Sequence, residues 1–228
     1  MVSGASRVEG KADLTSGRYL VWDWNGTLLD DRDLCIESVN AMLARRGLKT
    51  IATADEYRAI FRFPVQDYYR ALGFEFADGD FPEIAREYIS LYQGASGRCG
   101  LVRNGLGALE RARDLGFTQV LLSASEQRNL ERQVGERGLI RFFERVLGTG
   151  DVYARSKADV ARRWIEKTGI DPARLVFVGD TDHDLEIALS VGAYCVLYSG
   201  GHQFVPESPD GSWSVIDDLA ELPDILER

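Results

Sequence analysis

The sequence predicts a doubly wound α/β core, built on a parallel sheet, with a block of α-helices inserted into it. Three observations carry this prediction. Apolar runs without polar alternation, such as residues 175–178 (Leu-Val-Phe-Val), are typical of strands that are buried on both faces of a parallel sheet. From about residue 98 onward such runs alternate with helical patterns, as right-handed crossover connections require. Residues 33–97, in contrast, show helical patterns only.

The first expected element is a strand at residues 19–22, which ends at Asp23. A tight turn at residues 25–27 (Asn-Gly-Thr) follows it. A helix is expected at residues 33–47, because apolar residues recur there at helical spacing until a glycine ends the pattern. Further helices of the same block are expected at residues 53–61, 64–72 and 81–92.

Beyond the inserted block, helices and strands alternate along the chain. The expected helices are residues 106–115, 126–137, 157–168 and 182–190, and the expected strands are residues 118–123, 175–178 and 194–197. The prediction therefore divides the chain into a loose tail (1–18), an α/β core (19–32 and 98–228) and a helical cap (33–97).

Composition and charge exclude several classes of partner. The net charge is −9 and the isoelectric point is near 4.9, whereas nucleic acids are bound through concentrated Lys and Arg. Cys35, Cys99 and Cys195 lie outside any C-x-x-C spacing, which indicates neither a disulfide framework nor a zinc site. Neither a signal peptide nor a membrane-spanning run is apparent in the sequence. We therefore expect a cytoplasmic protein with a small-molecule partner and with no nucleic-acid or membrane partner.

Polar residues follow three of the expected strands. The first strand ends at Asp23, the second at Ser123 and a later one at Asp180, with Asp184 one turn into the next helix. Ligands of open α/β sheets bind beyond the carboxyl ends of the strands. One aspartate after a strand is commonly only a turn or cap residue. Polar residues at the carboxyl ends of three strands instead indicate a functional site.

In these segments the sequence resembles the haloacid dehalogenase superfamily. Residues 21–30 (VWDWNGTLLD) resemble its nucleophile loop, and Leu122-Ser123 resembles its second motif. Lys157 is similar to the third motif, and residues 179–184 (GDTDHD) are similar to the acidic fourth motif. The inserted helices resemble the cap of phosphoglycolate-phosphatase-like members. The resemblance implies a doubly wound core with an inserted helical cap, and a hydrolase that transfers phosphoryl groups.

The resemblance also implies roles for these residues. Asp23 would attack phosphorus and form an aspartyl phosphate. Asp23, Asp180 and the backbone carbonyl of Asn25 would bind Mg²⁺, which prefers oxygen ligands. Asp184 is a further ligand, a residue that orients the ligands, or only a favourable acid in the first turn of a helix. Lys157 would balance the charge of the nucleophile and of the phosphoryl group.

The phosphate oxygens are expected to contact Thr27, Ser123 and Ala124. The two hydroxyl groups can donate hydrogen bonds to phosphate, and backbone N–H groups of the nucleophile loop can do the same.

Asn25 departs from the family pattern. Family phosphatases usually carry an aspartate two residues after the nucleophile, which protonates the leaving oxygen and later activates water. An amide can do neither, and such general acid–base assistance contributes about 10²–10⁴-fold to the rate. The backbone carbonyl that would bind the metal is unaffected.

Three functions are compatible with these residues. The leading hypothesis is Mg²⁺-dependent hydrolysis of a small organic phosphate through an aspartyl phosphate, slowed by Asn25. One alternative is cleavage of a carbon–phosphorus bond, which requires a Schiff-base lysine from the cap, where Lys49 is the sole lysine. The other is a pseudoenzyme that binds a phosphorylated ligand. Carbon–halogen cleavage is disfavoured, because that branch works without the metal site that Asp180 and Asp184 retain.

Other residues are open to two interpretations. His183 is either a proton carrier near the metal or a surface histidine at the start of a helix. His202 is a candidate for facing the cleft. Arg58 and Arg62 are candidates for clamping an anionic substrate beneath the cap. The aromatic residues around them recur at helical spacing, which is typical of a core.

Overall fold

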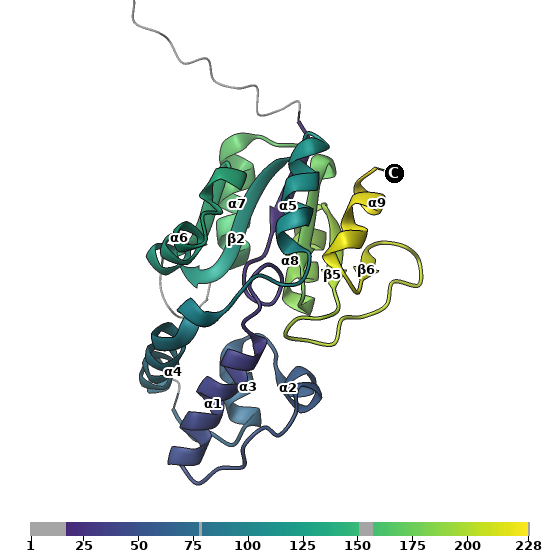
Figure 1. Cartoon of the computed structure of the whole chain (residues 1–228). Helices are drawn as coiled ribbons and strands as arrows, with labels where there is room; N and C mark the ends of the chain where they lie inside the picture. Colours follow the sequence, from purple (N-terminus) through teal and green to yellow (C-terminus); the bar gives the residue numbers. More distant parts are fainter. Residues whose placement is uncertain (1–16, 78, 151–156, 228) are drawn as a thin grey trace, which may run out of the picture.

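The computed structural model describes residues 17–77, 79–150 and 157–227. Its core is a six-stranded parallel sheet of order β3-β2-β1-β4-β5-β6 (Figure 1). The first strand of the chain thus lies inside the sheet, between β2 and β4. The strands are β1 (Tyr19–Trp22), β2 (Thr118–Glu126), β3 (Arg145–Thr149), β4 (Leu175–Gly179), β5 (Tyr194–Tyr198) and β6 (Ser214–Ile216).

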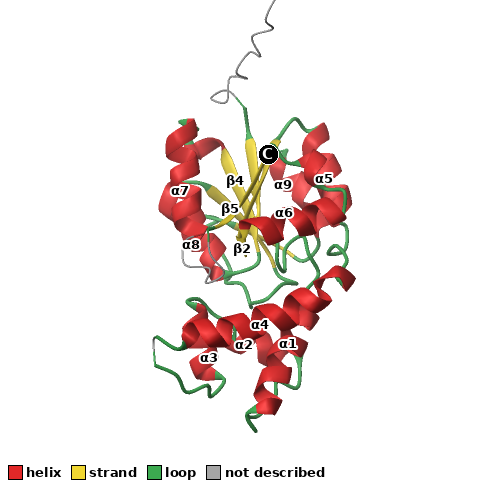
Figure 2. Cartoon of the chain, turned by 90° about the vertical axis from the view of Figure 1, so that its left-hand side faces the viewer, coloured by secondary structure: helices red, strands yellow, loops and turns green. Residues whose placement is uncertain are grey.

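Helices cover both faces of the sheet (Figure 2). Side chains of β1 alternate between the faces: Leu20 and Trp22 pack in one core, and Tyr19 and Val21 pack in the other. The first core contains α5 (Gly105–Asp114), α6 (Gln127–Glu136) and α9 (Leu222–Leu226), and the second contains α7 (Lys157–Thr168) and α8 (Asp182–Val191). The prediction of a doubly wound α/β core is confirmed.

The inserted helices form a separate layer beyond one end of the sheet (Figures 1 and 2). They are α1 (Arg32–Arg45), α2 (Ala54–Ile60), α3 (Val65–Ala71) and α4 (Phe81–Ala95). This layer, called the cap below, has a hydrophobic core of its own, in which Met42 and Leu43 of α1 and Phe81 of α4 are buried. Because β1 ends directly before the cap, the cap lies over the carboxyl ends of the strands.

The structure adds elements that the sequence pattern did not predict. β3 and β6 are the two edge strands, and α9 follows β6. β2 is also longer than expected, because it continues to Glu126, whose side chain accepts hydrogen bonds at the start of α6. Most of the expected tail, residues 1–16, lies outside the described residues. Within the described ranges, no helix combines the length and hydropathy that a membrane span requires.

Candidate active site

Three aspartates and one lysine meet where β1 and β4 end. Ligand oxygens of Asp23, Asp180 and Asp184 lie within 4.8 Å of one another. The ammonium Nζ of Lys157 lies 2.7 Å from Oδ1 of Asp23 and 2.5 Å from Oδ1 of Asp184. Asp23 and Asp180 directly follow parallel strands that are paired in register, which brings the two carboxyl groups to the same edge of the sheet.

Burial and mutual repulsion govern the charge of this cluster. Burial raises the pKa of Asp23 to about 8 despite the opposing effect of Lys157, and burial raises the pKa of Asp180 to about 6. At Asp184 burial also acts to raise the pKa, but the Lys157 ammonium and the hydrogen bond from Thr181 together lower it. One ammonium therefore faces three carboxyl groups, and an additional cation would favour the ionised form of all three.

The backbone fixes Asp184 at the start of α8. Asp184 and Thr181 form a capping box, in which each side chain accepts a hydrogen bond from the other residue's N–H group. The Thr181 hydroxyl also donates to Oδ2 of Asp184 at 2.7 Å, while Oδ1 faces Lys157. Gly179 is required here, because a Cβ atom at this position would lie 2.3 Å from Cγ of Asp184. This arrangement orients Lys157 through Asp184.

Both oxygens of Asp180 also have partners. Oδ1 accepts from the hydroxyl of Thr27 at 2.7 Å, and Oδ2 accepts from the backbone N–H of His202 at 2.7 Å. A Cβ atom at Gly201 would lie 2.2 Å from Oδ2 of Asp180, so glycine allows the loop to approach. The Thr27 hydroxyl has one hydrogen, and it donates that hydrogen to Asp180. In this arrangement the hydroxyl is not available to the phosphate oxygen that the sequence analysis assigned to it.

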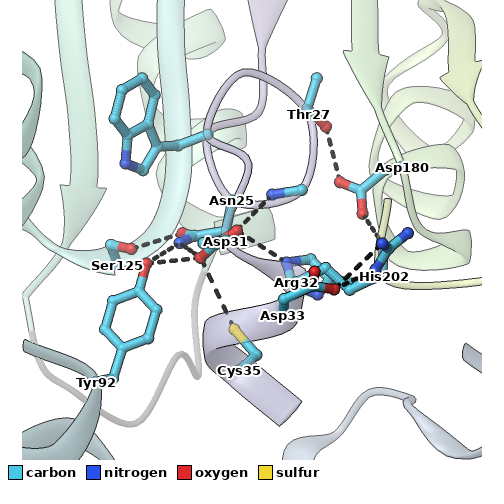
Figure 3. Close-up of polar contacts among 12 residues, drawn as sticks. Asn25, Thr27, Asp31, Arg32, Asp33, Cys35, Tyr92, Ser125, Asp180 and His202 are labelled. Carbon is cyan, nitrogen blue, oxygen red and sulfur yellow. Dashed lines mark hydrogen bonds and ion pairs between the residues drawn. The ribbon is translucent and has the colours of Figure 1, made fainter. Parts of the chain in front are cut away.

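The side chain of Asn25 is held at both ends (Figure 3). Its Nδ2 donates to Oδ2 of Asp31 at 2.7 Å and to the hydroxyl oxygen of Tyr92 at 2.9 Å. Its Oδ1 accepts from the hydroxyl of Ser125 at 2.9 Å, and the hydroxyl of Ser123 lies 3.4 Å away. An amide satisfies this pattern because it donates on one side and accepts on the other.

Asp31 forms a buried ion pair with His202 next to Asn25. Oδ1 of Asp31 lies 3.2 Å from Nε2 of His202, and it also accepts from the backbone N–H of Gly26 at 2.9 Å. Nδ1 of His202 lies 2.9 Å from the hydroxyl of Tyr57 in α2. Burial alone would lower the pKa of His202, but the Asp31 carboxylate raises it to about 9. The pair is therefore charged at neutral pH and joins the nucleophile loop to the cap.

A cavity of about 220 Å³ lies between this cluster and the cap. Asp23, Asn25, Ser123, Ala124 and Lys157 line its end in the α/β core. Its cap wall is predominantly aromatic and includes Tyr57, Phe61, Phe63, Tyr68, Tyr69, Phe81, Tyr88 and Tyr92, together with Cys35, Val65, Ala85, Ile89 and Gln93.

Comparisons with known proteins agree with this geometry. The profile of the family described as haloacid dehalogenase-like hydrolase matches residues 20–198, well over half of the chain. The chain belongs to this family. Similar proteins include a phosphoglycolate phosphatase of Pseudomonas savastanoi pv. phaseolicola, 27% identical over 90% of this chain and 78% of that protein. Another is the N-acetylmuramic acid 6-phosphate phosphatase of Pseudomonas aeruginosa, 29% identical over 92% of this chain and 95% of that protein.

Solved structures share the fold of this haloacid dehalogenase-like hydrolase. A predicted phosphatase from Clostridium acetobutylicum superposes with a TM-score of 0.77 at 18% identity, over 93% of this chain and 99% of that chain. The enzyme class that the sequence predicts, a haloacid dehalogenase-like hydrolase similar to phosphoglycolate phosphatases, is thereby confirmed.

The arginines of the cap do not line the cavity of this haloacid dehalogenase-like hydrolase. The guanidinium of Arg58 donates to the backbone carbonyls of Ser199 and Gln203, so it joins cap and core. Arg62 lies in the segment between α2 and α3, is exposed, and donates to the carbonyl of Ile60 at the end of α2. The expectation that an arginine here clamps an anionic substrate is therefore not met in this structure.

The two histidines occupy different positions in the site. His183 lines the cavity and stacks on Phe63 of the cap, with ring centroids 4.7 Å apart. Burial lowers its pKa, so the imidazole is neutral at physiological pH. His202 is buried at the cavity, and it lies beyond the segment that the family profile matches.

Sequence reasoning missed three residues of the hydrolase that hold Asn25. Asp31 follows the last residue of the nucleophile motif, Ser125 lies two residues beyond the second motif, and Tyr92 belongs to the cap. The pattern did contain one signal, because Asp31 is an acid directly after an expected loop. An acid at that position is equally typical of a surface turn.

Proposed function

We propose that this chain is a Mg²⁺-dependent phosphatase that hydrolyses monoesters of small organic alcohols, with Asp23 as the nucleophile. The observation that carries the proposal is the position of Asp23. It lies at the end of the cavity in the α/β core, paired with Lys157 and next to Asp180. A buried carboxylate at such a place has the reactivity that covalent phosphoryl transfer requires.

The chemistry proceeds in two displacements. A carboxylate oxygen of Asp23 attacks phosphorus, the bond between phosphorus and the ester oxygen breaks, and the alcohol departs. Water then attacks the phosphorus of the aspartyl phosphate, which releases phosphate and restores the carboxylate. Lys157 holds Oδ1 of Asp23 at 2.7 Å, so we assign the attack to Oδ2. The ammonium also compensates charge on the phosphoryl oxygens during both steps.

The donor set fits Mg²⁺. Asp23, Asp180 and the backbone carbonyl of Asn25 would hold the ion, because Mg²⁺ prefers oxygen ligands and the three buried carboxyl groups face only one ammonium. When bound, the ion supplies positive charge near the phosphoryl group. Asp184 would act mainly through Lys157, because Lys157 and Thr181 already occupy its two oxygens.

Asn25 limits the rate in this proposal. Its amide nitrogen donates to Asp31 and its amide oxygen accepts from Ser125, so it exchanges no proton with substrate or water. The leaving group must therefore depart with its own developing negative charge, and esters of acidic alcohols should react faster.

The carbon–phosphorus alternative receives no support from the cap. Lys49 is exposed, pairs with Glu56 at 2.7 Å and does not line the cavity, so it is not placed to form a Schiff base with a bound substrate. The pseudoenzyme alternative predicts that a phosphorylated ligand binds but is not hydrolysed. An assay of phosphate release distinguishes this outcome from turnover.

The test combines phosphate release with trapping of the intermediate. Wild-type protein with Mg²⁺ is expected to release phosphate from phenyl phosphate and, after acid quench, to carry one phosphoryl group on Asp23. Asp23→Asn should lose both signals, whereas Asp33→Asn, the same change at an exposed residue of α1, should keep both. Binding of phenyl phosphate by the wild type without phosphate release would establish the pseudoenzyme instead.

A further inference from the structure

The cap wall of the cavity is a continuous cluster of aromatic rings. The ring of Phe61 packs edge-on against Phe63 and Tyr68, with centroids 5.6 and 5.2 Å apart, and stacks on Tyr57 at 5.3 Å. Tyr68 continues the cluster to Tyr69 at 5.5 Å. Rings arranged in this way offer faces and edges to another flat ring. A substrate group that enters the cavity therefore meets aromatic surface on its cap side.

The cap wall also lacks a cation. The described residues of the cap that line the cavity include neither lysine nor arginine, and the undescribed cap residue 78 is an aspartate. In the core, Lys157 is already shared between Asp23 and Asp184. Glu126 lines the cavity as well, and the cation of His202 is already paired with Asp31, so a second anionic group on the substrate would find no unpaired cation among the described lining residues. The leaving group should therefore be uncharged.

Size and closure restrict the leaving group further. The cavity of about 220 Å³ is smaller than the roughly 300–1,000 Å³ of pockets that bury drug-sized ligands. Cap and core are joined around it by the contact of Tyr57 with His202, the stack of Phe63 on His183 and the hydrogen bond from Gln203 to the carbonyl of Phe61. This volume suits a single ring better than a ring with long flanking groups.

One polar atom in the aromatic wall has no partner. The hydroxyl of Tyr68 is buried and makes no hydrogen bond within the described part of the chain, although its residue lines the cavity and is only 4% exposed. Buried polar groups are nearly always paired in folded proteins. Burial also raises the pKa of Tyr68 well above its ordinary value, so the hydroxyl remains a neutral donor. A polar group on the substrate would supply the missing partner once a shift of the Tyr68 side chain opens the buried hydroxyl to the cavity.

From these observations we infer that the substrate is a phosphorylated phenol, with its ring seated against the cap aromatics and a polar ring substituent bonded to the Tyr68 hydroxyl. This inference rests on the proposed phosphatase function of the same site. Asn25 supports it independently, because a phenol ionises near pH 10 and departs without an acid more readily than an aliphatic alcohol. Hydrolysis breaks the bond between phosphorus and the phenol oxygen, and the phenolate takes its proton from water.

The first experiment tests the ring and its charge. We compare kcat/KM for 4-carbamoylphenyl phosphate and 4-carboxyphenyl phosphate, which have the same ring and differ in the charge of one substituent. Each value is taken relative to that of uncharged aryl phosphates of the same leaving-group pKa, because the two phenols also differ in acidity. The uncharged ester is expected to react at least about tenfold faster, and to exceed 2-phosphoglycolate by more. Equal kcat/KM values for the two aryl esters, or faster turnover of 2-phosphoglycolate, would overturn the inference. The proposed function would still stand in that case, provided that hydrolysis depends on Asp23. If no ester in the series releases phosphate, the proposed function fails and the inference fails with it.

The second experiment tests the hydroxyl of Tyr68. The ratio of kcat/KM for 3- or 4-hydroxyphenyl phosphate to that for phenyl phosphate should fall about tenfold in Tyr68→Phe. Tyr194→Phe, the same change on the exposed side of β5, should leave this ratio unchanged. An unchanged ratio in Tyr68→Phe for both isomers would refute the assigned contact.

A third arm separates a free phenol phosphate from a phosphotyrosyl residue in a protein. Because the cavity volume suits one ring and cap and core are joined around it, a phosphotyrosyl peptide is expected to react at least about tenfold more slowly than phenyl phosphate. Faster turnover of the peptide would overturn the assignment to a free phenol phosphate.

Discussion

Replacing Asn25 with aspartate tests the charge arrangement beside the nucleophile. Nδ2 of Asn25 donates to Oδ2 of Asp31 at 2.7 Å. Asn25→Asp turns this donor into an acceptor and sets two carboxyl groups against each other in a buried site. Two unit charges 2.7 Å apart repel by about 6 kcal/mol at an effective dielectric constant of about 20. That repulsion is large enough that one of the two acids should take up a proton in the folded state.

Proton uptake limits the loss of stability and makes it depend on pH. Each unit by which a pKa is raised corresponds to about 1.4 kcal/mol. We expect Asn25→Asp to lower the free energy of unfolding by about 3–5 kcal/mol near pH 8, as when a buried charge loses its partner. The loss should be smaller near about pH 5. A carboxyl group with a raised folded-state pKa keeps a proton that the unfolded chain has released, so stability falls as pH rises through this window.

Urea unfolding at the two pH values measures this effect. Asn104→Asp is the matched control, because Nδ2 of Asn104 donates to Asp218 at 2.8 Å at an exposed site. There the loss should stay within about 1 kcal/mol. The double variant Asn25→Asp with Asp31→Asn restores a donor opposite an acceptor but removes the carboxylate that pairs with His202, so it should recover only part of the loss near pH 8. Wild-type stability of Asn25→Asp near pH 8 would refute the reasoning. Intact-mass analysis must precede the assay, because Asn25-Gly26 is a pair prone to deamidation.

Three further predictions concern His202, the metal and the cap. The raised pKa of His202 stabilises the folded protein fully below pH 6.5, and this contribution is lost as pH rises through about 9. The free energy of unfolding, measured with urea, should therefore decline less over this window in His202→Gln than in wild type. Mg²⁺ should raise the Tm of the wild type in thermal unfolding, and Asp180→Asn should reduce that rise, because it removes a ligand charge. Phe63→Ala removes the stack on His183, and we expect a loss of about 1 kcal/mol in urea unfolding and a higher KM for phenyl phosphate.

The elements that were predicted from the sequence are those with a local signal. β1 and β4 are continuous apolar runs that end in acids, so both the strands and the positions of Asp23 and Asp180 follow from the pattern. The edge strands β3 and β6 lack that signal. β3 is only partly buried and contains Gly148, and β6 has three residues, so neither produces an apolar run.

Contacts between distant residues explain what the sequence did not reveal about the site. Asp31 and His202 are 171 positions apart, and nothing near either residue indicates that they pair. For Thr27, the residue type shows a hydroxyl donor but does not show whether the acceptor is a phosphate or Asp180. For Arg58, the charge is evident, whereas its use in joining cap and core depends on the course of the loop near Gln203.

The contact of Tyr57 with His202 constrains the order in which the protein can mature during its synthesis. The two residues are 145 positions apart, and at about 5–20 residues per second a ribosome needs about 7–30 s to cover that distance. The cap helices emerge early and have their own hydrophobic core. The loop that closes them against the sheet emerges much later. A ribosome-bound chain that stops at residue 198 therefore carries the nucleophile and His183 but lacks His202 and Gln203, which also join cap and core around the cavity.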